Sequence, residues 1–125
     1  RDHGLADEAH TLVPEAMHGY RGVIQRFGTE GPALLAARLM SECFGLEGHW
    51  DRSVAFLDSV SASFGNDPRA GFLLEFAARV AVEQLANKPR AVELLSIVQS
   101  RYPGSDVAML AQVYADSLAL QTPLP

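Results

Sequence analysis

The feature that most constrains the fold is an internal repeat with a period of 37 to 38 residues. Three segments end alike, in Arg26-Phe27-Gly28, Ser63-Phe64-Gly65 and Arg101-Tyr102-Pro103, so a closing aromatic residue recurs after 37 and then after 38 residues. A period of this length is typical of stacked supersecondary units, each of which buries its apolar face against its neighbours. We therefore expect a repeat architecture.

The residues that lead into each closing aromatic residue have helical spacing. A small residue is followed by a large apolar residue four positions later, a valine three positions after that and the aromatic residue four further on. Steps of four, three and four place these side chains on one helix face. The three columns are Ala16, Ser53 and Ala91; Tyr20, Leu57 and Leu95; and Val23, Val60 and Val98.

A turn and another helical pattern follow each of these segments. The turns are rich in glycine, proline and capping residues, which are helix-start signals. The columns of the next helix lie at i, i+4 and i+8: Leu35, Phe72 and Leu110; Leu39, Phe76 and Tyr114; and Cys43, Val80 and Leu118. We expect this face to be apolar and, in the last helix, to pack on the preceding pair through Val107, Leu110, Ala111, Tyr114 and Leu118.

The pattern predicts an all-α fold of six to seven helices in a single domain, residues 1–125, with no strand-like alternation. The chain begins with Arg1 rather than methionine, which is consistent with a fragment of a longer protein. A further helical turn is expected within Leu5–Leu12. The six main helices are expected near Pro14–Phe27, Pro32–Leu46, Trp50–Phe64, Pro68–Ala86, Pro89–Tyr102 and Ser105–Gln121.

These helix–turn–helix units resemble the tetratricopeptide-repeat (TPR) superfamily, whose usual repeat is about 34 residues. The stretch Gly48–Ser53 resembles that family's glycine–x–aromatic–x–x–small entry to the second helix, and Tyr102–Ser105 is similar to links in bacterial envelope TPR proteins. The family's tryptophan and glycine signature in the first helix is missing, so we call the chain TPR-like. The resemblance covers residues 14–121. It implies a right-handed stack of antiparallel helix pairs, an α-solenoid whose concave surface holds protein partners, with no shared catalytic residue.

Composition excludes several classes of function. Apolar types make up 48% and charged types 20%, as in ordinary globular domains. The net charge of −5 comes without a basic patch, which argues against nucleic-acid binding. No apolar run approaches the ~20 residues of a membrane span, so direct membrane insertion is not expected. We expect a soluble domain of the cytoplasm or the periplasm, and a single cysteine does not choose between them.

No motif predicts catalysis, a metal or another cofactor. Cys43 shares its column with Val80 and Leu118, so a small buried apolar residue is favoured over a reactive thiol. The histidines form no HExxH pattern and the glycines no GxxxxGK[ST] loop. The histidines, all interpreted as surface residues, are His3, His10, His18 and His49.

Four charged residues are the first candidates for partner binding. Arg38 with Glu42 and Glu75 with Arg79 are i,i+4 pairs on repeat-related helices, beside the apolar face. They would either line a groove or form a solvated face, and their mixed charge favours a polar partner of neither strong sign. Trp50, at the start of a helix, would either pack against the preceding helix as a structural residue or stack on a ligand.

The final helix carries a second apolar stripe, Met109, Val113 and Leu120. The equivalent positions are Leu34, Arg38 and Gly45 in the helix expected near Pro32–Leu46, and Gly71, Glu75 and Val82 in the helix expected near Pro68–Ala86. All three positions are therefore large and apolar only in the final helix. We expect it to contact a second copy in a symmetric dimer, a protein partner or a missing C-terminal segment, unless Leu124 folds back over it or it is a small exposed patch.

The function favoured by these patterns is a non-catalytic interaction or scaffold module that binds a protein or peptide segment through its concave face or its final helix. An accessory or regulatory helical domain of a larger enzyme or of a membrane or envelope protein is the alternative. A small helical enzyme, using the carboxylates Glu42 and Glu75, ranks last.

Overall fold

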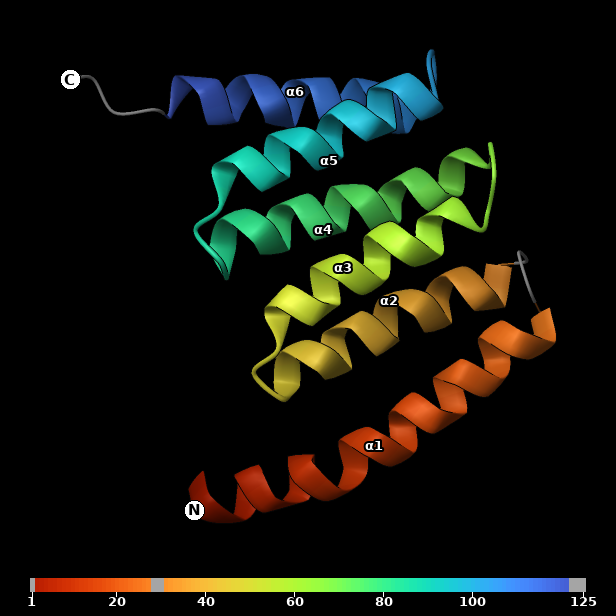
Figure 1. Cartoon of the computed structure of the whole chain (residues 1–125), viewed down its shortest axis with the longest axis vertical. Coiled ribbons are helices and arrows are strands. Elements are labelled where there is room, and N and C mark those ends of the chain that lie inside the picture. Colours follow the sequence, from red (N-terminus) through yellow and green to blue (C-terminus); the bar gives the residue numbers. More distant parts are fainter. Residues whose placement is uncertain (1, 28–30, 122–125) are drawn as a thin grey trace.

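The computed structural model describes residues 2–27 and 31–121, and it describes the side chains of the first helix from Val13 to Arg26. Over these ranges the chain forms six α-helices and one 3₁₀ turn and contains no strand, which confirms the all-α prediction (Figure 1). The elements are α1 (Asp2–Phe27), α2 (Gly31–Leu46), α3 (Trp50–Ala62), η1 (Pro68–Ala70), α4 (Gly71–Glu83), α5 (Lys88–Arg101) and α6 (Asp106–Leu120).

The first helix begins earlier than expected. Pro14 was expected at a helix start, but α1 runs without interruption from Asp2 through Pro14 to Phe27. The predicted turn within Leu5–Leu12 is therefore the first part of α1. Proline inside a helix lacks an N–H donor and crowds the preceding turn, and α1 curves along its length in Figure 1.

The fourth helix ends earlier than the predicted Ala86. Ala86 has φ = 51°, a left-handed conformation that an α-helix cannot include, and α4 ends at Glu83. The N–H of Asn87 then donates to the carbonyl oxygen of Ala81 at 2.8 Å, and the Asn87 side chain caps α5 by accepting from the N–H of Arg90 at 3.1 Å.

Each helix packs against the next one along the chain, and neighbours run in opposite directions (Figure 1). In addition, α2 contacts α4 and α4 contacts α6, so α4 lies at the centre. We call α2, α4 and α6 the first helices, and α3 and α5 the second helices. This order of contacts is what the repeat predicted.

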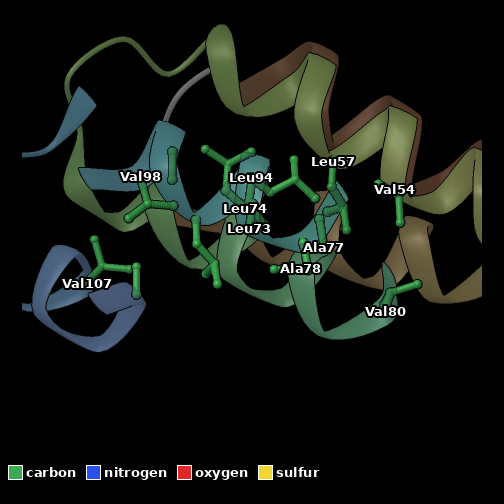
Figure 2. Packing of buried hydrophobic residues seen from close by; sticks show 14 of the residues in the cluster. Val54, Leu57, Leu73, Leu74, Ala77, Ala78, Val80, Leu94, Val98 and Val107 are labelled. Carbon is green, nitrogen blue, oxygen red and sulfur yellow. The ribbon is translucent and has the colours of Figure 1, made fainter. Parts of the chain in front are cut away.

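The second helices bury the columns that defined the repeat. Leu57 on α3, Leu74 on α4, and Leu94 and Val98 on α5 belong to one buried apolar cluster (Figure 2). Except for half-buried Val60, the column residues of α3 and α5 have 0% exposure: Ser53, Leu57, Ala91, Leu95 and Val98. The same columns are half-buried on α1, which lies at one end of the helix series.

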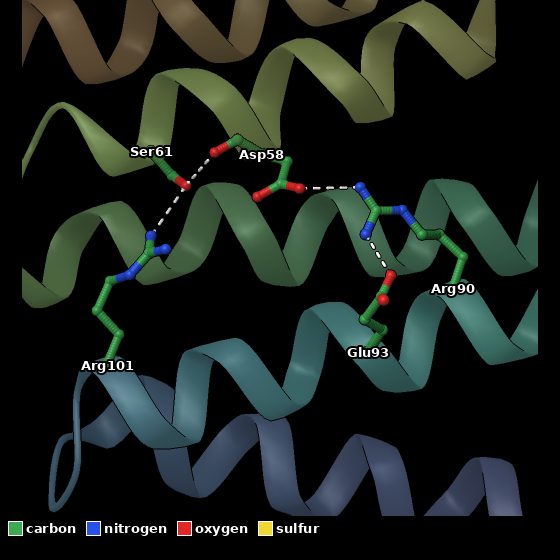
Figure 3. A network of polar contacts seen from close by, with 5 residues as sticks. All are labelled: Asp58, Ser61, Arg90, Glu93 and Arg101. Atoms are coloured by element: carbon green, nitrogen blue, oxygen red, sulfur yellow. Dashed lines mark hydrogen bonds and ion pairs between the residues drawn. The ribbon is translucent and has the colours of Figure 1, made fainter.

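Polar contacts also join the second helices to each other (Figure 3). Arg90 on α5 donates to Asp58 on α3 at 2.9 Å and to Glu93 on its own helix at 2.5 Å. Arg101 donates to the hydroxyl of Ser61 at 3.3 Å. These contacts fix α5 against α3 without using the first helices.

The first helices bury only part of their predicted apolar face. Cys43, Val80 and Leu118 are buried, and Leu39, Phe76 and Tyr114 are half-buried. The third column is exposed, at 61% for Leu35, 48% for Phe72 and 38% for Leu110. Leu110, which was expected within the packed face of α6, lies at the edge of that face, because Val107, Ala111 and Leu118 form its buried part.

Candidate partner-binding groove

A groove with a volume of about 510 Å³ runs along α4, between α2 and α6. Its floor comes from α4, from Phe72 to Glu83, and from the C-cap residue Gln84. Its sides include Arg38 of α2, Trp50 of α3 and Leu110 of α6. The full lining is Arg38, Trp50, Phe72, Glu75, Phe76, Arg79, Val80, Glu83, Gln84 and Leu110. We call this surface the α4 groove.

A ladder of exposed apolar residues crosses the same face. Leu35, Phe72 and Leu110 occupy equivalent positions of the three first helices, one repeat apart, and each is exposed. Phe72 and Leu110 line the α4 groove, and Leu35 and Phe72 line a neighbouring depression. A monomer gains nothing by exposing large apolar side chains in a row, and such a patch is typical of an interaction surface.

One ion pair of the groove is partly buried. Nε of Arg79 donates to Oε2 of Glu75 at 2.5 Å, and only 8% of the Glu75 side chain is exposed. The hydrogen bond and the charge of Glu75 raise the pKa of Arg79 above its ordinary value. The guanidinium also lies 5.7 Å from the ring centre of Tyr114 on α6, so the pair links α4 to α6.

The second ion pair is looser. Nε of Arg38 lies 3.6 Å from Oε2 of Glu42, and about half of each side chain is exposed, at 54% for Arg38 and 42% for Glu42. Such a pair adds little stability by itself. The guanidinium of Arg38 lies 4.5 Å from the ring centre of Phe76 on α4, and this contact holds Arg38 at the groove wall.

The structure thus brings three of the four predicted charged residues together. Arg38, Glu75 and Arg79 line the α4 groove, whereas Glu42 lies beside Arg38 outside the lining. The ring of Trp50 packs over Gly45 of α2, where a Cβ atom would overlap it, as expected of a structural residue. The same residue lines the groove.

The apolar stripe of α6 is exposed. Exposed fractions are 66% for Met109, 63% for Val113 and 87% for Leu120. Met109 and Val113 share a shallow depression with Asp106 and Leu110, so the stripe adjoins the ladder. Leu124, the residue named above as an alternative cover, lies outside the described residues.

Leu35, Phe72 and Glu83 also line this face, and they were not predicted as site residues. A signal was present: residues four apart on a helix are offset by about 40°, so a column at i, i+4 and i+8 drifts by about 80°. Leu35 and Cys43 therefore point in directions about 80° apart. Of the three residues at i, i+4 and i+8 on a first helix, the first and the last cannot both lie at the centre of the buried face.

The described residues offer little other chemistry. Cys43 is buried, and burial, followed by the nearby charges of Glu42 and Glu47, raises the pKa of its thiol. No set of three His, Cys, Asp or Glu side chains in the described ranges could hold a metal ion. His18 is exposed and His49 half-buried, while the side chains of His3 and His10 lie outside the described residues. Within the same ranges no helix is both long and apolar enough to cross a bilayer.

Comparisons with models of protein families, with curated proteins and with solved structures each found no match for this chain. The function must therefore be argued from the groove itself.

Proposed function

We propose that the chain is a non-catalytic protein-interaction module that binds a partner segment in the α4 groove. In this proposal the helices form a TPR-like, right-handed solenoid, and the first helices provide its binding face. The observation that carries the proposal is the exposed ladder of Leu35, Phe72 and Leu110, which repeats along the face with the period of the chain.

The composition of the groove supports binding to protein. Aromatic residues and arginine are enriched where proteins bind one another and carry much of the binding energy. The α4 groove contains Trp50, Phe72, Phe76, Arg38 and Arg79 in one surface. Covering the apolar part of that surface would contribute roughly 25 cal/mol per Å² removed from water.

The groove is also held in shape before a partner arrives. Arg79 is fixed by buried Glu75 and Arg38 by the ring of Phe76, while α4 packs against helices on both sides. Residues that are already ordered lose little conformational freedom on binding, which favours affinity.

Photo-crosslinking tests the proposal directly. A photoreactive phenylalanine analogue at Phe72, in the groove, should form discrete adducts with a protein partner in the native host. The same analogue at exposed Ser96 on α5 is the control, because Ser96 does not line the groove. Absence of discrete adducts at Phe72, or equal adducts at both sites, would contradict the proposal.

The α6 stripe provides a second proposed contact, with another copy of the chain. Val113→Glu places a charge in the exposed stripe and should lower the association state without loss of helical signal. Light scattering across a concentration series measures this. Ser96→Glu adds the same charge at an exposed position of α5, away from the stripe, and is the control. A parent protein that stays monomeric at high concentration would exclude this contact.

A further inference from the structure

The aromatic and charged side chains of α4 that face the groove follow a fixed order along the helix. Phe72, Phe76, Arg79 and Glu83 follow one another at steps of four, three and four residues, and all four line the groove. That spacing places them along one helix face, over about 16 Å at ~1.5 Å per residue. Along the floor, a partner therefore meets two aromatic rings, then a cation, then an anion.

The guanidinium of Arg79 is held in place but still has unused hydrogen-bond donors. Arg79 uses Nε to bind Glu75, and its two terminal nitrogen atoms have no hydrogen-bond acceptor among the described residues. Arg90, by contrast, commits both terminal nitrogen atoms to Asp58 and Glu93. The guanidinium of Arg79 can therefore still donate to a carboxylate from outside.

The anion at the end of this series is exposed. Glu83 is close enough for its charge to raise the pKa of Arg79, but its carboxylate makes no ion pair or hydrogen bond with any residue that the structure describes. A partner that covered Arg79 and Glu83 with charges of one sign would repel one of them. A partner with an acid opposite Arg79 and a base opposite Glu83 would satisfy both.

The walls of the groove favour a helical partner. They are side chains of helices, whose backbone groups are hydrogen-bonded within each helix, so the lining offers no strand edge for an extended peptide to pair with. A helix satisfies its own backbone groups and presents only side chains.

The geometry points to an amphipathic helix as the occupant of the α4 groove. One face of that helix carries bulky apolar residues opposite Phe72 and Phe76, an acidic residue opposite Arg79 and a basic residue opposite Glu83. In either direction of the partner chain, the acid lies next to the apolar residues and the base lies beyond it. This inference rests on the proposed function.

A display library tests the predicted order. The library is an alanine-rich helix of about 18 residues, long enough to be helical alone, randomised at four positions with the spacing of Phe72, Phe76, Arg79 and Glu83. Selection on the parent should enrich apolar, apolar, acidic and basic residues in that order or its reverse. Phe72→Glu should abolish the enrichment. If selection is the same with Phe72→Glu, both this inference and the proposed function fail.

A charge reversal separates the inference from the proposed function. Glu83→Lys changes an exposed side chain, so the fold should persist, and it should switch the preferred outermost residue of the peptide from basic to acidic. For one selected peptide and its Lys-to-Glu variant, the ratio of Kd values should invert, by about two- to fivefold each way. Selection that depends on Phe72 but does not respond to Glu83→Lys would overturn this inference alone.

A double variant tests the predicted acidic residue of the peptide, which lies opposite Arg79. Glu75→Gln with Arg79→Gln removes both charges of the partly buried pair, so that neither charge is left uncompensated. We expect the acidic preference next to the apolar residues to disappear while the outer basic preference stays. Retention of the acidic preference would contradict the role assigned to Arg79. Circular dichroism checks that each variant is folded.

Discussion

At the scale of single residues, the contact between Gly45 and Trp50 explains a feature that helix propensity opposes. Glycine inside a helix costs about 0.5–1 kcal/mol relative to alanine. Gly45 is nevertheless buried in α2, and a Cβ atom there would overlap the six-membered ring of Trp50. The missing side chain lets Trp50 pack on α2 and still line the groove.

Two glycine-to-alanine changes should therefore have opposite effects. Gly45→Ala should lower the free energy of unfolding by about 1–3 kcal/mol, because the ring of Trp50 must move. In Gly19→Ala in α1, the new Cβ has no atom within 4 Å apart from its chain neighbours and the backbone of its own helix, so the change should raise the free energy of unfolding by about 0.5–1 kcal/mol. Urea unfolding followed by Trp50 fluorescence measures both. Stabilisation by both changes would show that the ring of Trp50 yields at no cost.

Cys43 gives a pH-dependent prediction. The thiolate is the reactive form, and burial raises the pKa of this thiol, so less of it ionises at a given pH than in the denatured chain. Labelling by a thiol reagent should be slow in the folded protein, with its pH midpoint above that of the denatured protein. Rapid labelling of the native protein at neutral pH would show that Cys43 is accessible and reactive.

At the scale of elements, helix identity was predictable and helix ends were less so. Caps and apolar spacing gave α2, α3, α5 and α6 within a few residues. The start of α1 was not predictable, because a proline that usually marks a first helical position is also tolerated inside a helix when tertiary contacts compensate. The end of α4 was missed because Ala86 adopts a positive φ that alanine rarely takes, and nothing in its side chain signals that.

The cap of α6 provides the test at this scale. The hydroxyl of Ser105 accepts from the N–H of Ala108 at 3.1 Å. Ser105→Ala should lower the free energy of unfolding by about 1 kcal/mol, since one of the first N–H groups of the helix loses its acceptor. Ser96→Ala, at an exposed position inside α5, should change it by less than about 0.5 kcal/mol. Equal effects in chemical denaturation would show that the cap adds no stability.

At the scale of the whole molecule, the 37- to 38-residue period predicted the helical class and the order of packing. It did not predict which apolar residues line the groove. Which column of a first helix stays exposed depends on how the helix is rotated about its axis relative to its neighbours. The length of the repeat does not determine that rotation. Arg38, Glu75 and Arg79 were found because charges beside an apolar face stand out, whereas Leu35 and Phe72 looked like core residues.

The same period reveals a change of polarity on the last helix. Ala37 and Ser41 on α2, and Leu74 and Ala78 on α4, are equivalent positions with 0% exposure. On α6 these positions are Gln112 and Asp116, which are exposed, and Nε2 of Gln112 donates to Oδ1 of Asp116 at 2.9 Å. Thus α2 and α4 bury the residues at these positions, whereas α6 has polar residues there that are exposed to solvent. Polar outer faces of this kind keep helical stacks soluble.

Restoring the apolar face should therefore cause self-association. Gln112→Leu with Asp116→Ala gives α6 the residues that α4 buries at the same positions, with no helix of the described chain to cover them. We expect the mass measured by light scattering to rise with concentration while the helical signal is unchanged, because association removes apolar surface from water. Ser96→Leu with Ser100→Ala introduces the same residues, also four apart, on the exposed side of α5, and it should behave as the parent does. If the α6 variant keeps the mass of the parent at every concentration, then Gln112 and Asp116 are ordinary surface residues and do not limit how the helices of different copies join.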